Sequence, residues 1–133
     1  MPDPITGEGF DAPSPEVAYM GAPDPVEESA RLMQMASEMT TEAAAATARG
    51  ETFELDEEVA RLYLLRRAAL ADRLSLAHPD NGQFVTDAAR LAHELADHDH
   101  EHQSHGGPIG PRAIEWDPSH RPYVRQEYDH WGW

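Results

Sequence analysis

Apolar residues recur every three or four positions along three segments of the chain, which is the spacing of one face of an α-helix. Polar and charged residues, many of them acidic, occupy the intervening positions. We therefore expect three helices at about 25–48, 57–77 and 85–104.

Residues with known preferences for helix ends support these limits. Asp24 is a typical N-cap for the first helix, and Gly50 is a typical terminator. Pro79 ends the second helix, because the residue before a proline avoids helical geometry. Thr86 is the expected cap of the third helix.

The turn around residue 80 is short, so the second and third helices should be antiparallel neighbours in which positions whose numbers sum to about 160 meet. Two arginines of the second helix fall within its apolar arc. In this register we expect the structural ion pairs Arg66 with Glu94 and Arg73 with Asp87. The alternative is that both arginines extend to solvent without partners.

The pattern thus predicts an all-α fold, a small three-helix antiparallel bundle formed by a helical domain at 24–105. The preceding residues, 1–23, contain five prolines among glycines and acids and are typical of an extended arm. Residues 106–118 form a Gly/Pro connector. The helical spacing then returns in 119–133, which predicts a short aromatic C-terminal helix.

All three tryptophans lie in the last 18 residues. Exposed apolar patches of that size are uncommon on soluble monomers. We favour a tail that folds back to complete a core left thin by alanine-rich helices. The alternative is docking into a groove of a partner. The residues that such a partner would contact are Trp116, Tyr123, Tyr128, Trp131 and Trp133.

The composition narrows the choice of partner and compartment. A formal net charge of −15 over 133 residues disfavours nucleic acid and favours another protein with a basic surface; self-association stays open. The absence of cysteine excludes disulfides and thiolate metal ligands. No signal peptide or apolar run of membrane-spanning length is present, so we expect a cytoplasmic protein, or a virion-associated one if phage-encoded.

Along the face of the third helix that is expected to pack on the second, the residues change from apolar side chains to His98, His102 and His105. Histidines four apart share one helix face, and zinc accepts both imidazole and carboxylate ligands. This spacing indicates a candidate zinc site on His98 and His102, with His105 or Glu94 as third ligand. The alternatives are a pH-sensitive contact and a polar helix end without a site.

Residues His93-Glu94-Leu95-Ala96 resemble the start of the His-Glu-x-x-His helix of zinc metalloproteases, in which the glutamate activates water. The resemblance implies a zinc hydrolase. It spans four residues, and Asp97 stands at the position of the second histidine. We therefore do not extend that activity to this chain.

Three functions follow from these observations. The first, which the sequence favours, is a non-catalytic acidic helical protein that binds another protein as an adaptor, inhibitor or assembly component. The second is metal binding at the histidine-rich helix end. The third is a small zinc hydrolase. No cofactor other than zinc is expected.

Overall fold

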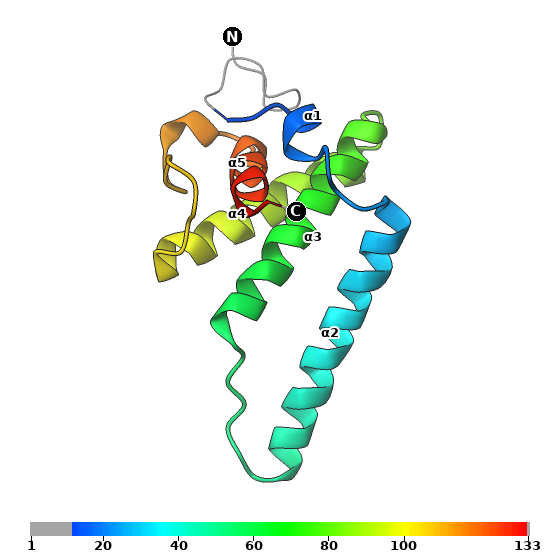
Figure 1. Cartoon of the computed structure of the whole chain (residues 1–133), viewed down its shortest axis with the longest axis vertical. Helices are drawn as coiled ribbons and strands as arrows, with labels where there is room; N and C mark the ends of the chain where they lie inside the picture. Colours follow the sequence, from blue (N-terminus) through cyan, green and yellow to red (C-terminus); the bar gives the residue numbers. More distant parts are fainter. Residues whose placement is uncertain (1–11, 133) are drawn as a thin grey trace.

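The computed structural model describes residues 12–132, and all regular structure within this range is helical (Figure 1). The predicted all-α class is confirmed. None of the helices described is long and apolar enough to cross a membrane. The elements are α1 (Pro15–Ala18), α2 (Pro25–Ala48), α3 (Glu57–Ala77), α4 (Gly82–His102), the 3-10 turn η1 (Ile114–Trp116) and α5 (Arg121–Trp131).

Local capping explains where α2 and α3 begin and end. The carboxylate of Asp24 accepts hydrogen bonds from two amides of the first turn of α2, and Asp56 does the same for α3. After α2, Gly50 takes a positive φ of 74°, and the amide of Glu51 donates to the carbonyl of Ala46. A glycine in this conformation ends a helix without the strain that a Cβ would bring.

Helix α4 begins three residues earlier than the sequence predicts. Asn81, rather than Thr86, is the N-cap, and its side-chain oxygen accepts a hydrogen bond from the amide of Phe84 at 3.1 Å. At the other end, α4 stops at His102 because Gln103 adopts a left-handed conformation with φ of 52°. The turn between α3 and α4 is therefore shorter than expected.

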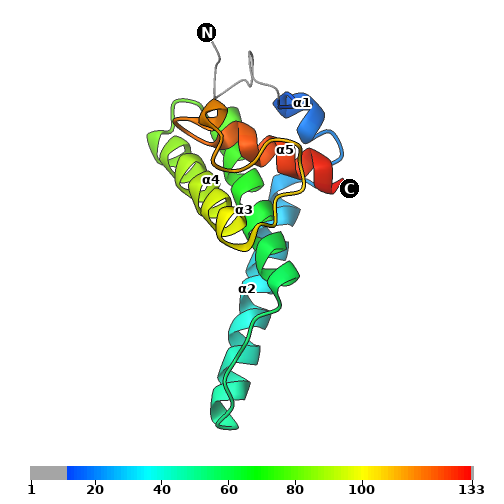
Figure 2. The ribbon, with the colours of Figure 1, turned by 90° about the vertical axis from the view of Figure 1, so that its left-hand side faces the viewer.

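Helix α3 lies at the centre of the molecule, and α2, α4 and α5 all pack against it. Figure 2 shows α5 lying across α3 and α4 with α1 beside it, and it shows α2 and the 49–56 segment extending beyond the other helices. The predicted three-helix bundle is therefore not the arrangement observed. Helix α5, instead of α2, completes the packing of α3 and α4, because it brings larger apolar side chains than the alanine-rich end of α2.

The N-terminal arm is also more ordered than predicted within the part that the structure describes. Residues 15–18 form α1, which packs against α5, and Ala12, Tyr19 and Ala22 lie against the core. Residues 1–11 lie outside the described range. The predicted extended arm is thus wrong for 12–23, where tertiary contacts override the proline-rich composition.

Helices α3 and α4 are antiparallel in the expected register, but the predicted ion pairs are wrong. Arg67, one position from the expected Arg66, donates to Glu94 at 3.0 Å. Arg66 instead pairs with the buried Glu28 of α2. Arg73 donates to the carbonyl of Pro23, and Asp87 accepts from Gln83 in its own helix. Both errors arise because α2 and the segment before it reach the side of α3 that carries Arg66 and Arg73.

The main core is built from small side chains of α3 and α4 and large ones of the C-terminal segment. Alanines let the α3 and α4 backbones approach closely, and aromatic rings from η1 and α5 pack against both helices. Its buried members are Leu65, Ala68, Ala69, Leu91, Ala92, Leu95, Ala96, Trp116, Tyr123, Val124 and Tyr128.

These contacts decide between the two interpretations of the aromatic tail. Trp116, Tyr123 and Tyr128 are at most 1% exposed, so they belong to the core and are not free to contact a partner. Trp131 packs partly buried against the same core, and Trp133 lies outside the described residues. The proposed docking role is therefore wrong for the three buried rings, and the tail folds back as favoured.

Helix α5 also buries three charged side chains, Arg121, Arg125 and Glu127, since all eight residues from 121 to 128 are buried. On one side, Arg125 forms two hydrogen bonds of 2.9 Å with the fully buried Asp72 of α3. Arg121 and the hydroxyl of Tyr19 donate to the same carboxylate. Asp72 thus joins α1, α3 and α5 at one point.

On its other side, α5 is held by a second set of charges. Arg61 of α3 binds Asp99 of α4 in a bidentate pair at 2.8 and 2.9 Å and reaches Glu127 of α5 at 2.7 Å. The hydroxyl of Tyr123 donates to Asp99 at 2.6 Å. Glu127 also accepts from the amides of Gly106 and Gly107, which fixes the connector against α5.

We predict that Asp72→Ala lowers the free energy of unfolding by about 3–5 kcal/mol, because it leaves two buried guanidinium groups without their shared carboxylate. Urea denaturation monitored by circular dichroism measures the change. Arg49→Ala is the control. It removes an ion pair with Glu51 in which both side chains are 58% exposed, and it should cost at most about 1 kcal/mol. Equal losses in the two variants would contradict the role of Asp72.

Candidate functional site

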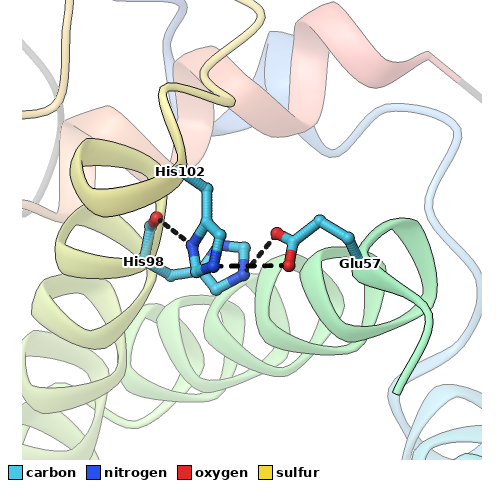
Figure 3. Close-up of side chains that lie close together, drawn as sticks. All are labelled: Glu57, His98 and His102. Carbon is cyan, nitrogen blue, oxygen red and sulfur yellow. Dashed lines mark hydrogen bonds and ion pairs between the residues drawn. The ribbon is translucent and has the colours of Figure 1, made fainter. Parts of the chain in front are cut away.

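Three side chains that can bind a cation converge where the start of α3 meets the end of α4. Glu57 lies in the first turn of α3, and His98 and His102 lie one turn apart near the end of α4. One ligand atom from each residue falls within 4.8 Å of the other two. Figure 3 shows both imidazole rings pointing toward the Glu57 carboxylate.

The two rings bind the two oxygens of one carboxylate. The Nε2 atom of His98 lies 2.8 Å from Oε1 of Glu57, and Nε2 of His102 lies 3.4 Å from Oε2. The rings stack with centroids 4.3 Å apart and planes inclined by 30°. The i, i+4 spacing on α4 therefore produces two stacked imidazoles that present the same nitrogen to one acid.

The other nitrogen of each ring also faces an acceptor. Nδ1 of His102 lies 2.9 Å from the carbonyl oxygen of His98, and Nδ1 of His98 lies 3.4 Å from Oδ1 of Asp99. Carbonyl and carboxylate oxygens only accept, and a neutral imidazole carries one N–H, so in each neutral ring one nitrogen faces an acceptor with a lone pair. In the tautomer with the proton on Nδ1, the lone pair of Nε2 is directed at the Glu57 carboxylate.

In that tautomer, a positive charge between Nε2 and the carboxylate would be attracted by both groups. Protons on Nε2 would supply it by making each ring an imidazolium, but two stacked imidazoliums repel each other. A metal ion supplies it while both rings stay neutral. The cluster can therefore hold a cation, and protons and metal ions compete for the same atoms.

The dimensions of the cluster suit zinc. Zinc binds imidazole nitrogen at about 2.0–2.1 Å and carboxylate oxygen at about 2.0–2.2 Å, so tetrahedral ligands lie about 3.3 Å apart. The two distances to Glu57, 2.8 and 3.4 Å, bracket this spacing. The three ligand atoms lie within 4.8 Å of one another, so the side chains would have to close around an ion to reach this spacing, and Glu57 and His102 are exposed enough to move.

The surroundings make His98 the fixed member of the cluster. Its side chain is 13% exposed, whereas those of His102 and Glu57 are 40% and 50% exposed. Asp99, which orients His98, is buried. Burial by itself would raise the pKa of Asp99, but hydrogen bonds from Arg61 and Tyr123 outweigh it and lower that pKa, so the carboxylate stays charged. Such outer hydrogen bonds fix the ring and its tautomer in metal sites.

The sequence identified two of the three clustered residues. His98 and His102 lie together as expected, but neither proposed third ligand joins them. Glu94 pairs with Arg67 and Arg90, and His105 follows the left-handed turn at Gln103 that ends α4. The ligand that sequence reasoning missed, Glu57, could have been found by extending the antiparallel register to the start of α3, which places residue 58 opposite His102.

The histidines of α4 also do not face the core as predicted. The side of α4 that faces the core continues from Leu95 to Asp99, which is fully buried, and not to His98. His98 lies at the border of that face, and His102 is exposed. The carboxylate displaces histidine from the core because Arg61 and Tyr123 supply its hydrogen bonds.

The metalloprotease-like stretch does not contribute to the cluster. Nδ1 of His93 lies 2.8 Å from the carbonyl oxygen of Ala89, and its ring packs on that of His120 with centroids 4.2 Å apart. Glu94 is held by its arginine partners. Neither side chain faces Glu57, so the resemblance in sequence has no counterpart in the geometry.

Comparison with family models, with curated proteins and with solved structures finds no match to this chain. The class of the protein is therefore defined by its own features: an all-helical fold with a histidine and carboxylate cluster at one helix junction.

We predict that His120→Asn makes stability less dependent on pH. Burial lowers the pKa of His120, and His93 lowers it further. The unfolded chain therefore binds a proton more readily, so stability is lost as pH falls below about 6.5 toward the folded pKa. Asparagine tolerates the positive φ of 60° at this position.

The measurement is the melting temperature of both proteins between pH 7.5 and 5.5. The wild type should lose more than His120→Asn over this range. His105→Asn, which replaces an exposed histidine, is the matched control and should behave like the wild type. A parallel decline in all three proteins would contradict the role of His120.

Proposed function

We propose that this protein binds a divalent metal ion of the zinc class through Glu57, His98 and His102. The observation that supports this function is that both imidazoles direct Nε2 at one carboxylate while Nδ1 of each faces a separate acceptor. Three convergent ligands with oriented rings are what a zinc site requires.

The donor set favours some ions over others. Two imidazoles and one carboxylate suit zinc, copper(II), nickel and iron(II), whereas calcium and magnesium prefer ligand sets made of oxygen. The partial negative charge at the C-terminal end of α4, where His102 lies, adds to the attraction for a cation. We take zinc as the ion with which to test the site.

The proposed role is binding and not catalysis. A metal ion at this point would join the first turn of α3 to the last turn of α4, and its remaining position would accept water or a group from another molecule. The glutamate that the metalloprotease resemblance would make the general base, Glu94, is engaged by Arg67 at 3.0 Å. That contact supports a site without hydrolytic function.

We predict that zinc binds the untagged protein with a stoichiometry of one and that the double variant His98→Ala, His102→Ala loses this binding. Glu57→Gln should weaken it by about tenfold or more, because it removes the charged ligand. Isothermal titration calorimetry measures all three. The control is the double variant His100→Ala, His105→Ala, which removes two exposed histidines of the same tract and should bind as the wild type does.

The same titration has a defined pH dependence. A hydrogen bond to the carbonyl of His98 raises the pKa of His102, and Glu57 adds to the effect. Protons therefore displace the metal as pH falls, and binding should be tighter at pH 7.5 than at pH 5.5. Undiminished binding in the His98→Ala, His102→Ala variant would show that the tract binds zinc by composition, and the assignment would be wrong.

A further inference from the structure

Helix α3 has two opposite faces that carry apolar side chains, and the structure covers them unequally: α5 buries one, whereas α2 buries the other only in part. The face toward α5 carries Leu65, Ala68 and Asp72, all fully buried. The other carries Leu70 and Leu74, each two positions from Asp72. An offset of two residues corresponds to about 160° around a helix, so these leucines point away from α5.

The second face forms the floor of an open groove between α2 and α4, which we call the α2–α4 groove. On the α2 side, Val26, Ala30 and Met33 border a cavity of about 420 Å³ with Leu70 and Leu74. On the α4 side, Phe84, Asp87 and Leu91 border a second cavity of about 190 Å³ with the same two leucines. Leu70 and Leu74 border both cavities, which therefore lie next to each other along α3.

The α2 wall of this groove is unusually exposed for apolar side chains. Val26 is 76% exposed and Met33 is 71% exposed, and with Ala30 they recur at spacings of four and three. Residues at this spacing share one face of a helix. No segment within residues 12–132 covers this face, although α2 buries its opposite side against α3 through Leu32 and Met35.

We propose that the α2–α4 groove binds an amphipathic helix of another protein, apolar on one face and basic on the other. A helix fits because α5 occupies the other side of the same α3 helix, and an apolar groove between helices is a common site for an amphipathic segment. Spaced apolar anchors on that segment would contact Met33, Leu70 and Leu74.

Charge selects a basic partner over a second copy of this chain. The formal net charge is −15, and α2 carries four glutamates against one arginine. Two copies would bring like charges together, whereas lysines and arginines around an apolar stripe would be attracted. The charged residues that line the α4 side, Asp87 and Arg67, balance each other, so the preference for a basic partner rests on the net charge of the chain.

The test uses two synthetic peptides of about 18 residues, each with leucines on one helical face. One carries lysines on its other face, and the second carries glutamates. Fluorescence anisotropy at about 0.15 M salt, with a chelator present, should show binding of the lysine peptide and none of the glutamate peptide. None of the residues that line the groove belongs to the Glu57, His98 and His102 cluster, so a chelator should not affect binding.

Two substitutions separate groove binding from general attraction to an acidic protein. Met33→Ser should weaken binding of the lysine peptide at least tenfold. Ile114→Ser should leave it unchanged, since Ile114 is 83% exposed in η1 and does not line the groove. Both replaced side chains are exposed, so both variants should keep the wild-type circular dichroism spectrum.

Equal binding of the lysine peptide to Met33→Ser and the wild type would overturn the proposal, because attraction would then be independent of the groove. Analytical ultracentrifugation of the protein alone, which measures its oligomeric state, provides a second test. A dimer that dissociates on Met33→Ser would make a second copy the occupant and would also overturn it. A monomer at every concentration, together with the tenfold loss, would support a basic helical partner.

Discussion

The fold depends on the pairing of charges around α5. Arg61, Arg121 and Arg125 meet Asp72, Asp99 and Glu127, so three positive and three negative groups lie at or within the core. Removing such groups from water is costly unless each finds a partner of good geometry. The paired residues are far apart in the sequence, so the need to pair every buried charge fixes the positions of α1, α3, α4 and the connector together.

The candidate metal cluster inherits part of its order from that pairing. Asp99 is held by Arg61 and Tyr123 and in turn orients His98, so one ligand is tied to the core. Glu57 and His102 are more exposed and can adjust to an ion or release it. A site with one fixed and two adjustable ligands can exchange its ion with solvent, which is consistent with binding and not with permanent structural use.

The sequence predicted the helices and their register because these depend on local signals: apolar spacing, the cap Asp24 and the terminator Gly50. It also favoured a C-terminal segment that folds back onto the core, but it did not predict the charged contacts that hold α5 there. The partner of Arg121 and Arg125, Asp72, is about 50 positions away in the sequence. The signal was present in α3, where Asp72 interrupts an apolar face and so requires a buried cation.

The position of α5 in the chain has a consequence for how the molecule is made. During synthesis α3 and α4 leave the ribosome before α5, at about 5–20 residues per second. For that interval Asp72 and Asp99 have neither their arginine and tyrosine partners from α5 nor the aromatic side chains that later cover them. Folding of the whole unit therefore waits for residues 121–128, and a nascent chain stopped before them would present an incomplete core to chaperones and proteases.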